Sequence, residues 1–441
     1  MADDGAGDGS PPVRSFPYAC TPEPRRPWYA RYRAEGRSPL DCACHGLHYL
    51  VKYRRKWAGA PAEEGAHFRE QHGLLRALAR EPGRDGDVGL AMVGDVMWMA
   101  DGWDGFLADE VLDHLGRHDV VLGNLETAIS DSFRVSRPFP EFAWFNAPPA
   151  LLTAFRRPDG RNAFTALAVA NNHRLDYRDQ GVRDTLRFLD HEGIRHAGVR
   201  LAPDEPAYIT FEAGGLRIGL YAACWGPNSP RRAERSALTI ETLDGLAPES
   251  EREPDLAGPR DALAAMADDR VTLRVVYLHW GFEYELYPTP RQVRVAREIV
   301  RAGADIVFGS HPHVPQPAEV CFLNGYEQRY PGLDVPRSCL LEDAAGRPRK
   351  ALVCYSLGNF TTAMSTFLCR VGLVQSLSLR REPETGGVDW HRPRGRLVYN
   401  VPKKEAAGQR RLVLLGTWLA EHPDATADDL AFLRDHVVAE P

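Results

Sequence analysis

The stretch "GADIVFGSHPHVPQP", residues 303–317, joins a short apolar run to a polar turn that carries two histidines. The apolar run has the composition of a buried strand. Three prolines within residues 312–317 oppose helix formation, so the turn is expected to be extended. Side chains two residues apart in an extended chain project to the same side. The sequence therefore predicts that His311 and His313 face one point.

The same order of apolar run, turn and amphipathic helix repeats from Val88 onward, which is typical of an α/β fold. Glycines 214 and 215 interrupt an alternating pattern at 207–224 and predict a hairpin. The pattern alone indicates an open sheet with some antiparallel strands. The clearest predicted strands are 88–94, 120–124, 164–172, 271–281 and 351–360, and the clearest predicted helices are 106–118, 180–193, 290–303, 410–422 and 427–438.

Changes in composition divide the chain into three predicted parts. Residues 1–85 are expected to form an N-terminal extension that is basic, aromatic and partly flexible. The main domain is expected to cover 86–400, with a polar, turn-rich insertion at 321–350. Residues 401–441 are expected to add closing helices.

The composition indicates a folded enzyme and excludes some other classes of protein. The chain has 441 residues, of which 44% are hydrophobic and 26% charged, as in ordinary globular proteins. A net charge of −6 argues against nucleic acid as a partner, although residues 48–59 interleave basic and aromatic side chains. The sequence contains neither a signal-peptide pattern nor a membrane-spanning apolar run, so a cytoplasmic location is expected. The oligomeric state stays open.

Side chains able to bind metal recur just after the apolar runs, where an open sheet presents its loops to ligands. Each one alone has an ordinary explanation as a helix cap or a structural polar residue. Together they form a mixed oxygen and nitrogen set that suits Mn, Fe or Zn. The residues are Asp95, Asn124, Glu126, Asn172, His173, His279, His311 and His313.

Six motifs within residues 88–380 resemble, in order and approximate spacing, those of the CapA family of poly-gamma-glutamate capsule synthesis proteins. They are "GDVM", "NLE", "NNHRLD", "HWGFEYE", "GADIVFGSHPHVPQP" and "YSLGNF". That family looks like a branch of the calcineurin-like metallophosphoesterases. The resemblance implies a metallophosphatase-like αββα sandwich, in which helices flank two mixed sheets.

The resemblance also implies a role for each matching residue. One or two divalent ions would be held by Asp95, Glu126, Asn172, His279, His311 and His313, with Glu126 as the bridging carboxylate. His173 matches the acid that protonates the leaving oxygen. Asp176 is expected to orient His173, with a helix cap as the alternative role.

Four further residues are candidates for the second shell or for substrate contact. Asn124 could support the metal ligands, and Arg174 could balance negative charge on a substrate. Glu283 and Tyr284 lie in a loop suited to substrate contact. The alternative for Arg174 is an exposed residue at a helix start, and for the other two a polar turn.

The chain departs from the wider superfamily at Met97. Phosphoesterases of that superfamily usually carry a histidine two residues after the first aspartate, and methionine is a poor ligand for hard divalent ions. One of the two implied metal sites is therefore a ligand short.

Two classes of function follow. The first is a metal-dependent, phosphoesterase-like hydrolase in which metal-activated water attacks a phosphoester and His173 is the general acid. The alternative is a CapA-like protein that binds or modifies a glutamyl or acidic peptide or polymer, through amide chemistry or an accessory role, without phosphatase activity. The expected partner is accordingly a small-molecule or acidic peptide substrate.

Overall fold

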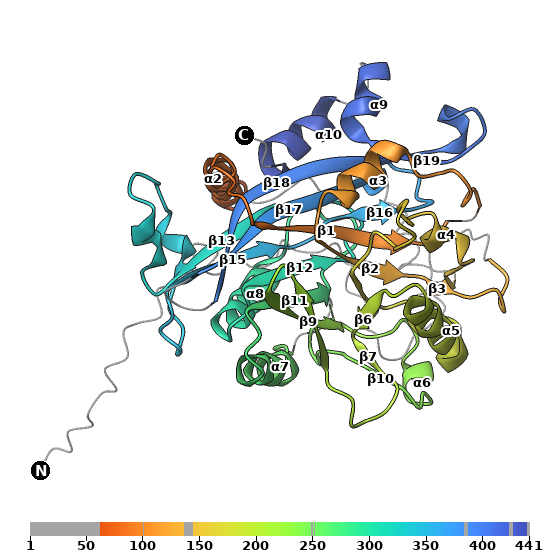
Figure 1. Ribbon diagram of the computed structural model, residues 1–441, viewed down its shortest axis with the longest axis horizontal. Coiled ribbons are helices and arrows are strands. Elements are labelled where there is room, and N and C mark those ends of the chain that lie inside the picture. The colour runs from red at the N-terminus through yellow and green to blue at the C-terminus, as the bar shows by residue number, and fades with distance from the viewer. Residues whose placement is uncertain are drawn as a thin grey trace, which may run out of the picture.

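The computed structural model describes residues 62–99, 101–135, 144–247, 250, 252–382, 387–422 and 427–438. Within these residues the long strands form two mixed sheets that pack face to face. Helix α3 lies beyond one sheet, α7 and α8 lie beyond the other, and α9 and α10 pack against the core between the sheets (Figure 1). The predicted αββα sandwich of two mixed sheets flanked by helices is confirmed.

The first sheet combines a parallel half with an antiparallel half. Strands β1, β2, β5 and β6 run parallel, whereas β17, β18 and β19 are antiparallel to their neighbours. The order of its described strands is β19 (Arg411–Leu414), β18 (Val388–Val401), β17 (Val371–Arg381), β1 (Val88–Met97), β2 (Val120–Glu126), β5 (Ala166–Ala168) and β6 (Arg195–Ala197), with β16 (Asn359–Thr361) beside β1.

The second sheet has a parallel centre of β9, β11, β12 and β15, flanked by the antiparallel partners β8 and β13, and β14 adds a short parallel pair beyond β13. The predicted hairpin around glycines 214 and 215 is its β8–β9 end. The order of its described strands is β14 (Leu340–Leu341), β13 (Ala318–Leu323), β15 (Arg349–Cys354), β12 (Ile306–Ser310), β11 (Leu273–His279), β9 (Leu216–Cys224) and β8 (Tyr208–Ala213).

Shorter elements complete the described fold. Two small strand pairs join β3 (Ala128–Ile129) to β4 (Asn146–Ala147) and β7 (Val199–Arg200) to β10 (Thr239–Ile240). The α-helices are α2 (Ala62–Leu78), α3 (Asp109–Gly116), α4 (Ala150–Thr153), α5 (Arg178–His191), α6 (Pro230–Ala233), α7 (Ala257–Asp268), α8 (Pro290–Arg301), α9 (Leu415–Glu421) and α10 (Ala427–Phe432). Shorter helical turns are Tyr326–Arg329, Arg337–Cys339, Leu368–Arg370, Lys403–Glu405 and Leu433–Val437.

Alternation along the buried strands produces the layers. Leu90 and Met92 of β1 point into the core between the sheets, and the intervening Ala91 points toward the layer of α3 and α5. In β11, Val275 faces the inner core and Val276 faces the layer of α7 and α8. Because both faces of these strands are covered, their sequences are continuously apolar rather than alternating.

The carboxyl end of the chain differs from its sequence prediction. Residues 410–422 were expected to form one helix, but Arg411–Leu414 is strand β19 and only Leu415–Glu421 is helical. Tyr399 of β18 pairs with Val413. The helix prediction fails for the first half because pairing with a sheet edge outweighs the helical preference of leucine.

The predicted division into parts stays a prediction. Residues 1–61, including the basic stretch 48–59, lie outside the described residues. Helix α2, from the end of the predicted extension, packs on the second sheet, where the side-chain oxygen of Gln71 accepts from the Val320 amide at 2.9 Å. The predicted insertion 321–350 begins inside strand β13.

Candidate functional site

The predicted metal ligands converge between the two sheets. Asp95 and Glu126 lie at the carboxyl ends of β1 and β2, and Asn172 follows β5 in the same sheet. His279 ends β11 of the second sheet, and the turn after β12 carries the other two histidines. The exposed fraction is 0% for Asp95, Glu126 and His279, and 3% for Asn172, His311 and His313. The structure therefore brings all six together in the interior.

Their potential ligand atoms form three overlapping groups, each with all of its atoms within 4.8 Å of one another. The groups are Glu126 with His279 and His311, Asp95 with Glu126 and His313, and Glu283 with His311 and His313. Glu126 belongs to two groups, as a carboxylate shared between two neighbouring cations would.

Asp95 is held in place by donors from both sheets. Its Oδ1 accepts from Asn124 Nδ2 at 2.7 Å and from the hydroxyl of Ser310. Its Oδ2 accepts from the backbone amide of His311 at 3.2 Å. Burial alone would raise the pKa of Asp95, but the hydrogen bond and charge of His313 and the hydrogen bond from Ser310 outweigh it and lower the pKa to about 2.

A chain of hydrogen bonds fixes the ring of His279. The Tyr277 hydroxyl lies 2.9 Å from His279 Nδ1 and also contacts the Ser310 hydroxyl, which in turn donates to Asp95. Burial lowers the pKa of His279 to about 3, so the ring is neutral and carries one N–H. Because the Ser310 proton points to Asp95, the Tyr277 hydroxyl must donate to Ser310. The N–H at His279 Nδ1 must then donate to the Tyr277 oxygen.

That assignment leaves the lone pair of His279 Nε2 facing other acceptors. Nε2 is 2.8 Å from Asn172 Oδ1 and 3.3 Å from Glu126 Oε1. Neither carboxylate oxygen of Glu126 accepts a hydrogen bond from any residue in the described part of the chain. Burial and the charge of Asp95 raise the pKa of Glu126 well above its usual value. A buried cluster of acceptors without donors fits a bound divalent cation.

The histidine turn differs from its sequence prediction in the backbone. His311 and His313 have φ angles of +100° and +58°, so the turn is not extended. Their rings nevertheless lie close together, with centroids 5.9 Å apart. The prediction of an extended turn is wrong because both histidines have a left-handed backbone conformation. Contacts made by the turn stabilise this strained conformation. One such contact is the 2.8 Å bond from the Tyr284 amide to the Pro312 carbonyl.

His173 and Asp176 form a buried pair beside the predicted ligands. His173 Nδ1 lies 2.7 Å from Asp176 Oδ2, which also accepts from the Phe145 amide at 2.8 Å. The Phe145 ring stacks on His173 at a centroid distance of 3.8 Å. On the other edge, His173 Nε2 lies 3.4 Å from Nδ2 of the exposed Asn228. The pair is thus oriented, with Nε2 toward the surface.

The four candidates for the second shell or for substrate contact lie at different distances from the predicted metal ligands. Asn124 supports Asp95, as described above. Arg174 is only 1% exposed and donates to the Thr127 carbonyl at 2.6 Å, so it is not the exposed helix-start residue of the alternative prediction. Burial lowers the pKa of Arg174 to about 10. Glu283 reaches His311 and His313, and the ring of Tyr284 lies 6.1 Å from that of His313.

Several supporting residues were missed by sequence reasoning. Tyr277 and Ser310 link His279 to Asp95, and Asn359 Oδ1 lies 2.9 Å from His313 Nδ1. Asn171 donates to Asn124 Oδ1 at 3.2 Å, and Asn228 accepts from Asn172 Nδ2 at 3.1 Å. Tyr277 was detectable as a polar group two residues before His279 on the same strand. Asn228 carries no comparable signal.

Met97 lies at the end of β1, opposite Glu126 in the pairing of β1 with β2. It is 2% exposed and belongs to the core between the sheets, and its sulfur accepts from the Thr362 hydroxyl at 3.7 Å. The thioether is therefore packed in the core between the sheets.

Comparison with known proteins gives matches of several kinds. The capsule biosynthesis protein CapA of Bacillus anthracis is 30% identical over 200 residues, which cover 45% of this chain and 40% of that protein. A "probable polyglutamine synthesis accessory protein" of Mycobacterium tuberculosis is 30% identical over 275 residues, which cover 59% of this chain and 64% of that protein. The chain thus matches less than two thirds of the length of these relatives. A novel phosphatase of Mycoplasma pneumoniae, solved by crystallography, has a TM-score of 0.38 and 11% identity, covering 73% of this chain and 96% of that one.

The family comparison covers the candidate site. The model of the bacterial capsule synthesis protein family PGA_cap matches residues 89–364, more than half of the chain. The matched range contains every predicted metal ligand, the His173–Asp176 pair, the second sheet and the parallel half of the first sheet, whereas β17, β18 and β19 lie beyond it. The chain therefore belongs to the PGA_cap family of bacterial capsule synthesis proteins, to which the CapA resemblance of its six motifs pointed.

Proposed function

We propose that the protein is a metal-dependent hydrolase of the CapA and metallophosphoesterase type, acting on a phosphoester. One observation carries the proposal: the buried Glu126 oxygens, which accept no hydrogen bond from the described residues, face Nε2 of His279 and lie beside the oriented pair of His173 and Asp176. A cation cluster next to a positioned acid is the arrangement that hydrolysis of an anionic ester needs.

The proposed ligands of one or two ions of Mn, Fe or Zn are Asp95, Glu126, Asn172, His279, His311 and His313. When bound, such ions polarise an anionic substrate and lower the pKa of a water molecule. Tyr277 and Ser310 would keep His279 in the tautomer that leaves Nε2 free to coordinate. Asn359 would orient His313 in the same way.

His173 would hold and release the proton. Asp176 accepts from Nδ1 and stabilises the protonated ring, which leaves the Nε2 proton for the departing oxygen. Phe145 restricts the ring by stacking on it. Since Nε2 points toward exposed Asn228, the substrate would approach from that side. Arg232, which donates to the carbonyls of Leu175 and Asp176, lies over the half-exposed Trp144 and adds positive charge close to this pair.

The test is elemental analysis of the purified protein together with hydrolysis of a generic aryl phosphate. The proposal expects a bound divalent ion and an activity that is lost in His173→Ala at unchanged metal content. A metal-loaded protein that cleaves no phosphoester would refute it.

A second function is favoured by Met97 and by the names of the relatives. The residue in place of the expected histidine gives no hard ligand, and the Mycobacterium tuberculosis relative is described as an accessory protein. On this alternative the chain binds or modifies a glutamyl or acidic peptide or polymer without phosphatase activity. Binding of oligoglutamate by a protein inactive on aryl phosphates would favour it.

A cytoplasmic location also belongs to the proposal. Among the helices of the described residues, none has the length and apolar character needed to span a bilayer. Cell fractionation with an antibody to the native protein would test the location.

A further inference from the structure

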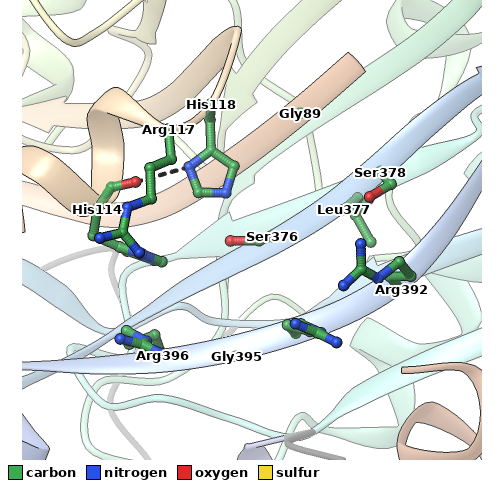
Figure 2. A pocket seen from close by; sticks show the side chains of 11 residues that line it. Gly89, His114, Arg117, His118, Ser376, Leu377, Ser378, Arg392, Gly395 and Arg396 are labelled. Atoms are coloured by element: carbon green, nitrogen blue, oxygen red, sulfur yellow. Dashed lines mark hydrogen bonds between the residues drawn. The ribbon is translucent and has the colours of Figure 1, made fainter. Parts of the chain in front are cut away.

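A cavity of about 650 Å³, here called the basic groove, opens on the first sheet away from the candidate metal site. Gly89, at the start of β1, lines it, whereas Asp95 lies near the other end of the same strand. The two sites are therefore about 20 Å apart along β1. Figure 2 shows His114, Arg117 and His118 on one side of the cavity, Arg392 and Arg396 on the other, and Ser376 between them.

The floor of this basic groove follows from the alternation of β17. Val374 packs in the core layer that contains Leu115 of α3. Ser376 and Ser378 occupy the next positions on the same face, and both are half-buried. Helix α3 ends at Gly116, so it does not extend over the two serines. The sheet thus changes from an apolar to a hydroxyl-bearing surface where the helix stops.

The wall of the groove is formed by β18. Arg394 and Arg396 are exposed and alternate with buried Gly395, so they share one face of the strand. The pairing with β17 shifts between Ser376 and Ser378, and Arg392 has a φ of +53° at this bulge. Bulges redirect side chains. Here the bulge lets Arg392 line the same cavity as its two neighbours.

Three arginines of the groove keep their positive charge unpaired within the described part of the chain. Arg117, Arg392 and Arg396 form no ion pair with a described residue, and Nε of Arg392 has no hydrogen-bond partner there. Asp119, just after α3, uses its carboxylate to accept from the Gly89 amide at 2.8 Å. Burial, the charge of His118 and the charges of Arg396 and Arg117 lower the pKa of His114 to about 4.

We propose that this groove binds a compact oligophosphate, either free or as part of a phosphorylated small molecule. Guanidinium groups from β18 and from the end of α3 face a common volume and bind phosphate oxygens in pairs. The serine hydroxyls add further donors. No Phe, Tyr or Trp of the described residues lines the groove, so it lacks the stacking platforms of single-stranded nucleic-acid sites. The proposal stands independently of the hydrolase function.

The test is a calorimetric titration of the full chain with tripolyphosphate in a buffer that contains EDTA, since guanidinium groups need no metal. Arg117→Gln combined with Arg396→Gln removes one exposed charge from each side. Arg411→Gln, an exposed arginine on β19, is the matched control. We expect saturable 1:1 binding to the wild type and the control, and binding at least about tenfold weaker in the double variant at an unchanged melting temperature.

Three results would overturn the proposal: no binding by the wild type, equal binding by the double variant, or tighter binding of hexaglutamate than of tripolyphosphate. If the double variant fails to fold, Arg396→Gln alone replaces it, and the expected loss is then smaller but still absent from Arg411→Gln.

Discussion

The hydroxyl of Tyr277 lies 2.9 Å from Nδ1 of His279, two residues further along the same strand. This contact continues through Ser310 to Asp95, so one proton chain links a proposed nitrogen ligand to a proposed oxygen ligand. The position of the His279 proton, and with it the availability of Nε2, depends on this chain.

Tyr277→Phe should weaken metal binding. The substitution removes the acceptor for His279 Nδ1–H and releases the tautomer, and loss of such supporting contacts typically costs about 10- to 100-fold in metal affinity or activity. Titration of metal-free protein with Mn or Zn measures the affinity. Tyr208→Phe, which removes a surface hydroxyl bonded to Asp269, is the control. Equal affinity in both variants would contradict the proposed role.

Glu126→Gln should make the metal-free protein more stable and reduce the stability that it gains on binding metal. The amide carries no charge and can donate to His279 Nε2, so the free energy of unfolding without metal should rise by about 1 kcal/mol. The wild type should gain about 2.7 kcal/mol at a metal concentration of about 100 times Kd, and the variant should lose most of that gain. Urea unfolding with and without metal measures both quantities. A large metal response in the variant would argue against Glu126 as a ligand.

His173→Ala should lower kcat on an aryl phosphate by about 10²- to 10⁴-fold. Asp176→Asn should have a smaller effect because the ring remains, stacked on Phe145, and loses only its ionised partner. Metal content should not change, since neither residue belongs to the three ligand groups. Asp179→Asn, which alters a nearby carboxylate bonded to Ser236, controls for local disturbance. If it matched His173→Ala, the acid role would fail.

His114 should make the protein less stable in mildly acidic solution. Its pKa in the folded protein is lowered from 6.5 to about 4, so the unfolded chain binds the proton more tightly. The stability contributed by the neutral ring is present above pH 6.5 and is lost as the pH falls toward 4. His114→Asn removes this dependence, so its melting temperature should fall less than that of the wild type over that range. Parallel pH profiles would contradict the prediction.

The helices and strands of the layers were predicted correctly where a regular pattern of apolar residues or a clear end signal marks them in the sequence. Pro290 and Gly303 bracket α8 as expected, and Thr289 adds a capping box with Gln292. The continuous apolar runs of β1 and β11 gave correct strands. Strand β19 was missed because it runs directly into helix α9, and pairing with the edge of β18 outweighs the helical preference of its leucines.

The site was predictable in its ligand atoms more than in its supporting contacts. Asp95 and His279 each follow a recognisable strand, so their convergence could be inferred from parallel topology. The positive φ angles of His311 and His313 could not, because they result from tertiary contacts that oppose the local preference of the chain. Asn228 likewise reaches His173 from a loop between β9 and α6.

Both sheets contribute to the proposed ligand set: Asp95 and Glu126 belong to the first sheet, and His279 ends a strand of the second. A cation held among them would crosslink the halves of the sandwich across their shared core. Cation binding and the association of the two sheets would then be thermodynamically coupled. Loss of the cation would therefore increase hydrogen exchange at the ends of β1 and β11 before it did so in the rest of the fold.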